Sequence, residues 1–301
     1  QIRERLAGRR DLEVLSIAAD RRKDQDERKR LLNAADIAIL CLPDDAAQES
    51  VSLIENGTTR VIDASTAFRV DPDWVYGFAE MDKGQSAAIA GARFVANPGG
   101  WPQGLIGTVR PLIEAGLLPA DFAITYNGIS GYTGGGKQMI AEYEAAGAAA
   151  SHFMAYALTF NHKHVPEMTR YTGLASAPLF VPTVGDFAQG MTTFVPLQLG
   201  QLGTVPTGAE LHAAIADHYA SIEDSFVTVA PFDPALGKTP ALDPQANNDT
   251  NTMTLHIFAN DARAQAVLVA VYDNLGKGAS GAAVQNLNLM LGVSAKESLA
   301  A

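Results

Sequence analysis

Cysteine is almost missing from this chain of 301 residues, in which Cys41 is the single thiol. One thiol cannot build a disulfide framework within the chain, and it excludes a zinc site made of several cysteines. Long apolar runs are missing as well, since no stretch approaches the length of a membrane-spanning helix. The charged opening QIRERLAGRR is not typical of a secretory signal. Together these absences predict a cytoplasmic protein with no membrane association.

Positive charge is also scarce. The chain has 22 Lys and Arg residues against 33 Asp and Glu residues, and the resulting net charge of −11 argues against nucleic-acid binding. The basic residues are unevenly spread, because six of them fall in the short stretch from Arg21 to Arg30. Such a run is more often a solvated helix face than a site, but it could form a local anion site.

The first hundred residues predict an α/β domain. Three short apolar runs without alternation, at 12–19, 36–42 and 60–65, are typical of parallel strands buried on both faces. Between the last two, residues 44–57 predict a helix that Asp44 or Asp45 would cap and Gly57 would end. This alternation of strand and helix predicts a Rossmann-type, doubly wound parallel sheet.

The rest of the chain predicts an α+β domain with a mixed sheet. Thr207 and Glu210 have capping-box spacing at the start of a helix, and a final helix over roughly 279–291 should stop at Gly292. The connection NDARA between the last two apolar runs indicates a hairpin. The strand-like runs are 121–130, 191–199, 225–231, 252–258 and 265–273.

The segment NPGGWPQG, residues 97–104, is a turn that leads into a helix with Pro102 near its first position. A side chain at residue 100 would lie at the helix N-terminus, where free amides and the helix dipole stabilise a thiolate. The residue there is Gly100, which has no side chain. Taken alone, this turn is more often structural than catalytic.

The segment NHKHVPEM, residues 161–168, brings two imidazoles and a carboxylate together. His162, His164 and Glu167 do not have the spacing of a helical zinc pair. They suit acid–base chemistry better, because an imidazole titrates near neutral pH and a carboxylate can orient it. A polar surface turn before Pro166 is the alternative.

Two glycine-rich segments could offer backbone amides to an anion. YNGISGYTGGGK, residues 126–137, follows a predicted strand but lacks P-loop spacing, so a flexible surface loop is the alternative. DNLGKGASGAAVQNLN, residues 273–288, precedes the final helix, and its Gln285 and Asn286 could hydrogen-bond a carboxamide. A helix entry with polar residues facing solvent is the alternative there.

In this order, the four segments resemble N-acetyl-gamma-glutamyl-phosphate reductase in its short, type 2 form. The similarity runs from about residue 12 to residue 292, and three further segments support it: DASTAFR (63–69), YGFAEM (76–81) and DFAQGM (186–191). The resemblance implies a Rossmann-like NADP-binding domain of residues 1–99 plus 279–301, and a catalytic domain of residues 100–278. It also implies an architecture shared with aspartate-semialdehyde dehydrogenase.

Carried over to this sequence, the resemblance assigns the catalytic positions. The nucleophilic cysteine falls on Gly100, and the acid–base histidine falls on His162. His164 and Glu167 would support it, and Tyr156 would help to position it. Among basic residues, Arg69 is the candidate for the substrate phosphate, since a guanidinium matches phosphate geometry.

The resemblance also implies an NADP site. A basic cluster after the predicted strand at 12–19 would hold the 2′-phosphate, Asn286 would hold the nicotinamide amide, and the family's glycine loop would come just before Gln1. The implied cofactor residues are Arg21, Arg22, Lys23, Leu42, Pro43, Ser65, Ser130, Gly131 and Asn286.

The activity implied is the NADPH-dependent reduction of an acyl phosphate to a semialdehyde, in arginine biosynthesis, by a homo-oligomer (dimer or tetramer). A thiolate would displace phosphate to give a thioester, so Gly100 predicts a chain that is inactive as it stands. Two alternatives are an enzyme resembling aspartate-semialdehyde dehydrogenase and a nucleotide-binding homologue without catalysis. The retained His162, His164 and Glu167 argue against the second alternative.

Overall fold

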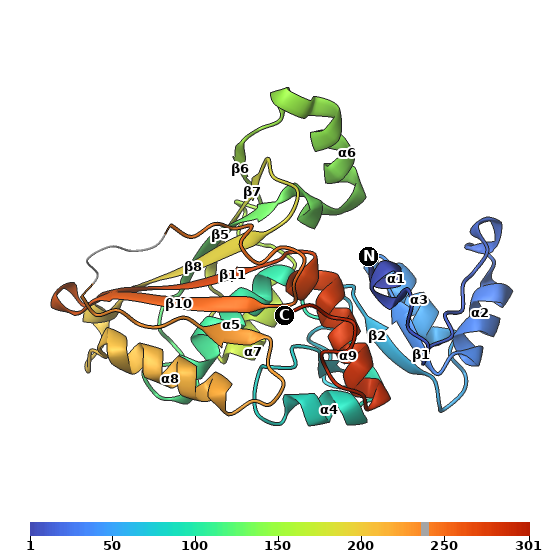
Figure 1. Cartoon of the computed structure of the whole chain (residues 1–301), viewed down its shortest axis with the longest axis horizontal. Coiled ribbons are helices and arrows are strands. Elements are labelled where there is room, and N and C mark those ends of the chain that lie inside the picture. The colour runs from blue at the N-terminus through green and yellow to red at the C-terminus, as the bar shows by residue number, and fades with distance from the viewer. Residues whose placement is uncertain (236–240) are drawn as a thin grey trace.

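The computed structural model describes residues 1–235 and 241–301, which form two sheets flanked by helices (Figure 1). The first sheet has four strands in the order β1-β2-β4-β3. The second has seven, in the order β6-β7-β5-β8-β11-β10-β9. A Rossmann-type parallel sheet and a separate mixed sheet are therefore both present, as the sequence predicted.

All strands of the first sheet are parallel: β1 (Ile37–Leu40), β2 (Arg60–Asp63), β4 (Phe94–Ala96) and β3 (Val75–Tyr76). Val61 and Ile62 are fully buried and belong to two different apolar clusters, one on each face of β2. Burial on both faces is why these strands lack alternation in the sequence. The strands predicted at 36–42 and 60–65 are confirmed.

The strand predicted at 12–19 is wrong. Residues 12–18 have no regular secondary structure, and they lead into a short 3-10 helix, η1 (Ala19–Arg21). A strand needs a hydrogen-bonded neighbour, and no segment of the described chain pairs with these residues. Val14 and Leu15 are consequently 51% and 43% exposed.

The helices of the first domain are α1 (Ile2–Leu6), α2 (Gln25–Ala34), α3 (Asp44–Ser52) and α4 (Gln85–Gly91). Helix α3 ends five residues before Gly57, so its predicted end was wrong. The Asp44 carboxylate does not cap it either, because it accepts hydrogen bonds from the backbone amide and hydroxyl of Thr66.

The C-terminal helix α9 (Gly281–Leu291) packs back onto the first sheet, as predicted. Val284, Leu287 and Met290 share an apolar cluster with Ile62 and Val95. The helix ends at Gly292, whose φ of 72° is left-handed. A π-helical turn, η6 (Gly276–Ser280), precedes it, so the α-helix starts two residues later than predicted.

The second sheet is mixed and carries the main core. Strands β10 and β11 form the predicted antiparallel hairpin, whereas β5 and β7 run parallel. Its strands are β5 (Thr125–Gly131), β6 (Phe153–Ala155), β7 (Leu179–Gly185), β8 (Met191–Gln198), β9 (Val227–Val229), β10 (Met253–Asn260) and β11 (Gln265–Tyr272).

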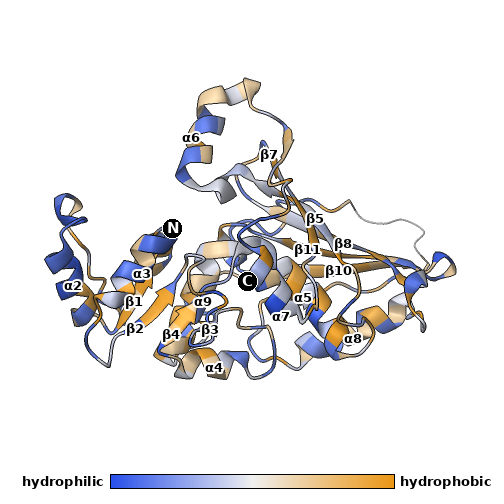
Figure 2. Ribbon diagram, turned by 180° about the vertical axis from the view of Figure 1, so that it is seen from behind, coloured by the Kyte–Doolittle hydropathy of each residue, from blue (hydrophilic) through white to orange (hydrophobic). Residues whose placement is uncertain are grey.

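Helices α5 (Gly100–Glu114), α7 (Val165–Thr172) and α8 (Gly208–Ala220) lie together on one side of this sheet (Figure 1). The predicted capping box of Thr207 and Glu210 starts α8. Helix α6 (Gly136–Ala146) stands away from the body of the molecule. Strongly apolar strands in both sheets contrast with the hydrophilic surface of α2 (Figure 2). Among the helices that the structure describes, none is long and apolar enough to span a membrane.

Candidate active site

The turn at residues 97–100 delivers the chain to the start of α5. Gly99 is the N-cap and Gly100 is the first helical residue, so the predicted place of residue 100 at a helix N-terminus is confirmed. The first amides of a helix have no partner within the helix and carry the positive end of its dipole. Residue 100 therefore lies where a negative charge is stabilised.

The two glycines of this turn have different surroundings. A Cβ on Gly99 would lie 2.5 Å from Nδ1 and Cε1 of His164 and 2.7 Å from Nη1 of Arg69, so only glycine fits there. A Cβ on Gly100 would meet only the backbone of Gly278, with the carbonyl oxygen at 3.1 Å. A small side chain at residue 100 thus needs only a slight shift of η6.

The Glu167 carboxylate is the centre of the site. It is 1% exposed, and α7, on which it lies, begins next to Pro166. Oε1 accepts hydrogen bonds from Arg69 Nη1 at 2.8 Å and from His164 Nδ1 at 2.6 Å. Oε2 accepts from the hydroxyl of Tyr76 at 2.7 Å and from the backbone amide of Gly99 at 3.1 Å. One carboxylate thus joins β3, the turn before α5 and the histidine pair.

These contacts keep Glu167 ionised. Burial alone would raise the pKa of this carboxyl, but the charge of Arg69 and the hydrogen bonds from His164 and Tyr76 hold that pKa at about 2. The same burial and the neighbouring carboxylate raise the pKa of Tyr76 well above its usual range. Tyr76 therefore stays a hydrogen-bond donor.

His162 lies beside His164, with ring centroids 4.7 Å apart. Its Nδ1 accepts a hydrogen bond from the backbone amide of His164 at 3.1 Å. Burial, and next the neighbouring His164 and Lys163, lower the pKa of His162 to about 4, so the ring is neutral at neutral pH.

Tyr156 connects α5 with His162. Its hydroxyl accepts a hydrogen bond from Nε1 of Trp101 at 3.0 Å, and its ring centroid lies 6.0 Å from that of His162. The structure therefore brings Tyr156, His162, His164 and Glu167 together at the N-terminus of α5. Their predicted catalytic roles stay predictions.

Arg69 is buried against Glu167. Its Nε donates to the carbonyl of Asn97 and its Nη2 to the carbonyl of Ala64, both at 3.0 Å. All of these contacts, including the ion pair to Glu167, are with other groups of the protein. They show a structural role for Arg69, and its role as a phosphate ligand stays a prediction.

The predicted phosphate cluster separates into paired and unpaired residues. Arg21 is bonded to Asp24 at 2.6 Å and approaches Glu27 at 3.4 Å. Arg22 and Lys23 are exposed, and within the part of the chain that the structure describes neither has a carboxylate partner. Only these two cations of the predicted three have their charge available to a ligand.

The other predicted cofactor residues lie mostly at the carboxyl edge of the first sheet. Leu42 and Pro43 connect β1 with α3, and Ser65 follows β2 and hydrogen-bonds the Asp63 carboxylate. Ser130 and Gly131 lie instead at the end of β5, in the second sheet. Only glycine fits at residue 131, because a Cβ there would come 2.5 Å from the carbonyl oxygen of Ala188.

Asn286 lies beneath the turn that starts α5. It is fully buried, and its Nδ2 donates to Oδ1 of Asn97 at 3.1 Å. Its own Oδ1 finds no hydrogen-bond partner among the described residues. A buried amide oxygen of this kind needs a donor, and the carboxamide of a nicotinamide could supply one.

The sequence pattern missed two parts of the site. Tyr76 is 91 residues from Glu167, and only its place in YGFAEM pointed to it. A buried ion pair between Lys277 and Glu80, at 2.6 Å, was also missed; both side chains are 1% exposed. Gln285 bonds both partners, and the Lys277 carbonyl accepts from Nε2 of Gln103 in α5.

A cysteine at the end of a buried strand is expected to be a small core residue, but Cys41 is exposed, so this expectation is wrong. It follows the last residue of β1, where the chain leaves the sheet. Partial desolvation raises the pKa of its thiol, and the Asp63 carboxylate adds to this effect. A thiol in that state is a poor nucleophile.

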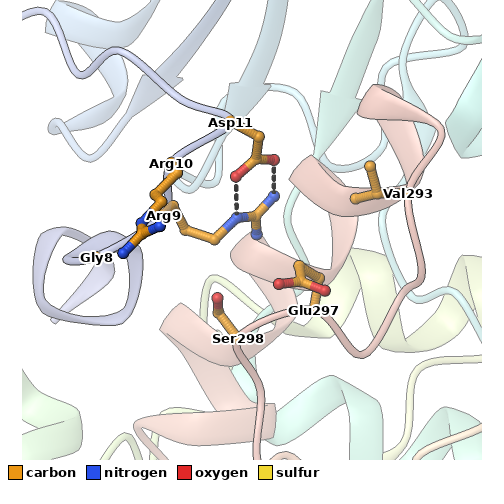
Figure 3. A pocket seen from close by; sticks show the side chains of 7 residues that line it. All are labelled: Gly8, Arg9, Arg10, Asp11, Val293, Glu297 and Ser298. Carbon is orange, nitrogen blue, oxygen red and sulfur yellow. Dashed lines mark hydrogen bonds and ion pairs between the residues drawn. The ribbon is translucent and has the colours of Figure 1, made fainter.

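A surface hollow is lined by residues other than those of this site (Figure 3). It lies between the end of α1 and the segment after α9, and the Arg9–Asp11 ion pair crosses it. None of the predicted site residues lines it. The lining residues are Gly8, Arg9, Arg10, Asp11, Val293, Glu297 and Ser298.

Comparison with known families finds two family models that match successive parts of the chain. Residues 7–89 match the family model described as semialdehyde dehydrogenase, NAD binding domain, and residues 101–274 match semialdehyde dehydrogenase, dimerisation domain. A solved aspartate semialdehyde dehydrogenase II from Vibrio cholerae, in complex with ASA, has the same fold. It matches with a TM-score of 0.65 at 15% identity, over 86% of this chain and 80% of that one. Fold and matches define a two-domain, NAD-binding dehydrogenase of the semialdehyde class.

Relatives with higher sequence identity indicate one family within this class. N-acetyl-gamma-glutamyl-phosphate reductase from Chelativorans sp. (strain BNC1) is 67% identical over 97% of this chain and 94% of its own length. The reductase from Mesorhizobium japonicum is 64% identical over 97% of this chain and 95% of its own length. The chain belongs to the N-acetyl-gamma-glutamyl-phosphate reductase family.

Proposed function

We propose that this chain has the binding and acid–base machinery for reducing N-acetyl-gamma-glutamyl phosphate to N-acetylglutamate semialdehyde with NADPH. Its cellular setting would be the cytoplasm. We further propose that Gly100 stops the reaction before its first chemical step. The observation that carries both proposals is the start of α5, where Glu167 holds the Gly99 amide and His164 lies against Gly99.

The residues of the site suit a thioester mechanism. A thiol at residue 100 would be activated by the helix N-terminus and by an adjacent imidazole. Amides at the same helix end would stabilise the tetrahedral oxyanion that forms when the thiolate attacks the acyl carbon. Glu167 would keep the turn and the imidazole in place throughout. Gly100 offers no atom that could attack, and the exposed Cys41 lies on the first domain.

The residues at the carboxyl edge of the first sheet fit NADP. Arg22 and Lys23, which have no carboxylate partner among the residues that the structure describes, would bind the 2′-phosphate. The Oδ1 atom of Asn286, which lacks a donor within the described chain, would accept from the nicotinamide carboxamide. The bound cofactor would supply the hydride that reduces the thioester.

The domain division that supports this proposal assigns residues 1–99 plus 279–301 to the cofactor and residues 100–278 to catalysis. The dimerisation-domain match indicates a homo-oligomer, and we propose a dimer as its smallest form. The face of the second sheet opposite α5 and α8 would meet the second copy. There Phe258 pairs with Val267, and His256 with Val269.

The proposal is tested with Gly100→Cys. The unchanged chain, which keeps Gly100, is the matched control. The Cys variant should reduce NADP in the presence of N-acetylglutamate semialdehyde and phosphate, and the Gly100 control should not. Activity must disappear when phosphate is omitted.

Two results would overturn the proposal. Turnover of aspartate semialdehyde alone would show that the aspartyl alternative is correct. A folded Cys variant that binds NADP but oxidises neither semialdehyde would favour the non-catalytic alternative.

A further inference from the structure

Three successive carbonyls of the π-helical turn η6 face the start of α5. The Lys277 carbonyl accepts a hydrogen bond from Nε2 of Gln103 at 2.8 Å, and the Ala279 carbonyl accepts one from Nδ2 of Asn97 at 3.2 Å. The carbonyl oxygen between them, that of Gly278, would lie 3.1 Å from a Cβ at residue 100. The two donor side chains come three residues before and three residues after residue 100, so η6 is bonded to the chain on both sides of the nucleophile position.

The turn is closely packed in this place. A Cβ on Gly276 would overlap the carbonyl oxygen of Thr250, and a Cβ on Gly281 would overlap Oδ1 of Asn251. These contacts pack η6 and the start of α9 against the segment before β10. A Cβ on Gly278 would lie 3.6 Å from the Cα of residue 100. The turn is therefore enclosed between that segment and α5.

This packing limits the direction of a side chain at residue 100. An atom attached to Cβ has three staggered positions. Because the Cβ itself would lie 3.1 Å from the Gly278 oxygen, a position that points toward this oxygen is excluded by overlap. The partial negative charge of the carbonyl oxygen also repels a thiolate. A sulfur at residue 100 must therefore point away from η6.

The Lys277 side chain anchors the turn. Its Nζ donates to Oε2 of Glu80 at 2.6 Å and to Oε1 of Gln285 at 2.8 Å. It also lies over the rings of Phe78 and Phe226. The other oxygen of Glu80 accepts from the amide of Phe226 at 3.1 Å and from Nε2 of Gln285 at 2.9 Å. Both charges are thus paired in the interior, between a residue that follows β3 and a residue that precedes β9.

Stability alone does not account for an ion pair in this place. Burying two charges has a large desolvation cost, and apolar side chains of similar volume are often at least as stabilising. What the pair adds is a fixed position, because each charge is stable only where its partner lies. The pair therefore fixes Lys277, and with it the carbonyl of Gly278, relative to both sheets.

We infer that η6 sets the direction of the nucleophile, and that Lys277 is the positioning residue that holds η6 in place. The ion pair with Glu80 acts through the carbonyls of the turn. The direction of the side chain follows from packing, while the kinetic consequence rests on the proposed function. A thiolate held in one direction meets the acyl carbon in a reactive geometry, and a displacement of about 1 Å can cost about a hundredfold in rate.

The test starts from a parent with Gly100→Cys and Cys41→Ser, so that its one thiol is at residue 100. Lys277→Met together with Glu80→Gln replaces both charges by neutral side chains of similar length. This double variant removes the ion pair without leaving a single charge buried and unpaired, which would endanger the fold.

A matched control and a second variant accompany it. Lys29→Met with Glu55→Gln is the control, because it removes an exposed pair of the same residue types with the same N–O distance of 2.6 Å. Gln103→Met is the second variant. It removes the donor to the Lys277 carbonyl and leaves the ion pair in place.

The first measurement is NMR of proteins labelled with ¹³C at the Cβ of their single cysteine. A sulfur held in one direction gives unequal couplings between Hα and the Hβ atoms, whereas exchange among the staggered positions averages these couplings. We expect unequal couplings in the parent and the surface control, and averaged couplings in the Lys277→Met/Glu80→Gln variant. Urea unfolding checks that each protein is folded.

The second measurement is turnover in the semialdehyde assay. The Lys277→Met/Glu80→Gln variant should lose about tenfold or more in kcat, while its KM should stay within about twofold. A loss confined to kcat indicates misplaced reacting groups and not weaker substrate binding. Gln103→Met should act in the same direction with a smaller loss, and the surface control should match the parent.

Unequal couplings and full kcat in a folded Lys277→Met/Glu80→Gln protein would overturn the inference. Averaged couplings in the parent itself would also overturn it. If the double variant does not fold, Gln103→Met decides by the same two measurements.

These outcomes are distinct from failure of the proposed function. If the parent never oxidises a semialdehyde but the couplings behave as expected, the reductase proposal fails and the positioning by η6 stands. If the parent is active and the variants are equally active, the positioning fails and the reductase proposal stands.

Discussion

Gly99 contacts Glu167, His164 and Arg69 of the site although it has no side chain. Its amide donates to Glu167, and its Cα hydrogens face His164 and Arg69 at distances that exclude a methyl group. A glycine is required here by close packing, since its backbone is not in the left-handed region. The position thus links the start of α5 with His164 and Glu167.

Gly99→Ala should therefore destabilise the fold. The added methyl would overlap the His164 ring and the Arg69 guanidinium, and such overpacking costs about 1–3 kcal/mol. Urea unfolding of the whole chain measures the loss. The matched control is Gly91→Ala at the end of α4, where a Cβ meets nothing within 4 Å; we expect no loss there. Equal stability of the two variants would contradict the packing described for Gly99.

At the scale of elements, several strands that are buried on both faces or alternate were predictable, but β7 (Leu179–Gly185), although largely buried, was missed. Strands β1, β2, β10 and β11 were found from these patterns. Residues 12–19 have the same apolar composition but no neighbouring strand, and composition does not reveal whether a neighbour exists. The short β3 and β4 were missed because two or three residues carry no periodicity.

The part of the site that lies close together in the sequence was also predictable. His162, His164 and Glu167 lie within six residues, so local spacing revealed them. The Tyr76 hydroxyl and the Gly99 amide reach Glu167 from 91 and 68 residues away, and single-sequence patterns carry no such pairing. The directions of the two imidazole rings also needed coordinates, because His162 contacts a backbone amide and His164 contacts a carboxylate.

The π-helical turn η6 joins the two sheets at the site. Lys277 in this turn bonds Glu80, which follows β3, while its carbonyl holds Gln103 of α5. The Glu80 carboxylate also accepts from the amide of Phe226, just before β9. A buried ion pair contributes little net stability, but it can favour one arrangement over others. Here the ion pair between Lys277 and Glu80 holds η6 next to residue 100.

At the scale of the molecule, one face of the second sheet is left without a covering helix in the part of the chain that the structure describes (Figure 1). Phe258→Asp would place a charge on this face, and we expect it to shift the proposed dimer to monomers because buried unpaired charge is costly. Sedimentation velocity measures the change, and circular dichroism confirms that the monomer is folded. Val14→Asp, at an exposed apolar residue of the first domain, is the control. A folded Phe258→Asp protein that keeps the parent's mass would show that the interface lies elsewhere.

The central claim is that the molecule is a reductase site complete except for the nucleophile at residue 100. It is tested most directly by intact-mass spectrometry of Gly100→Cys after exposure to N-acetyl-gamma-glutamyl phosphate without NADPH. Without hydride the reaction should stop at the thioester, so the account predicts one N-acetylglutamyl group per chain, located on residue 100 by peptide mapping. The unchanged chain should gain nothing. A folded Gly100→Cys protein that stays unlabelled, or that carries its label on Cys41, would contradict the account.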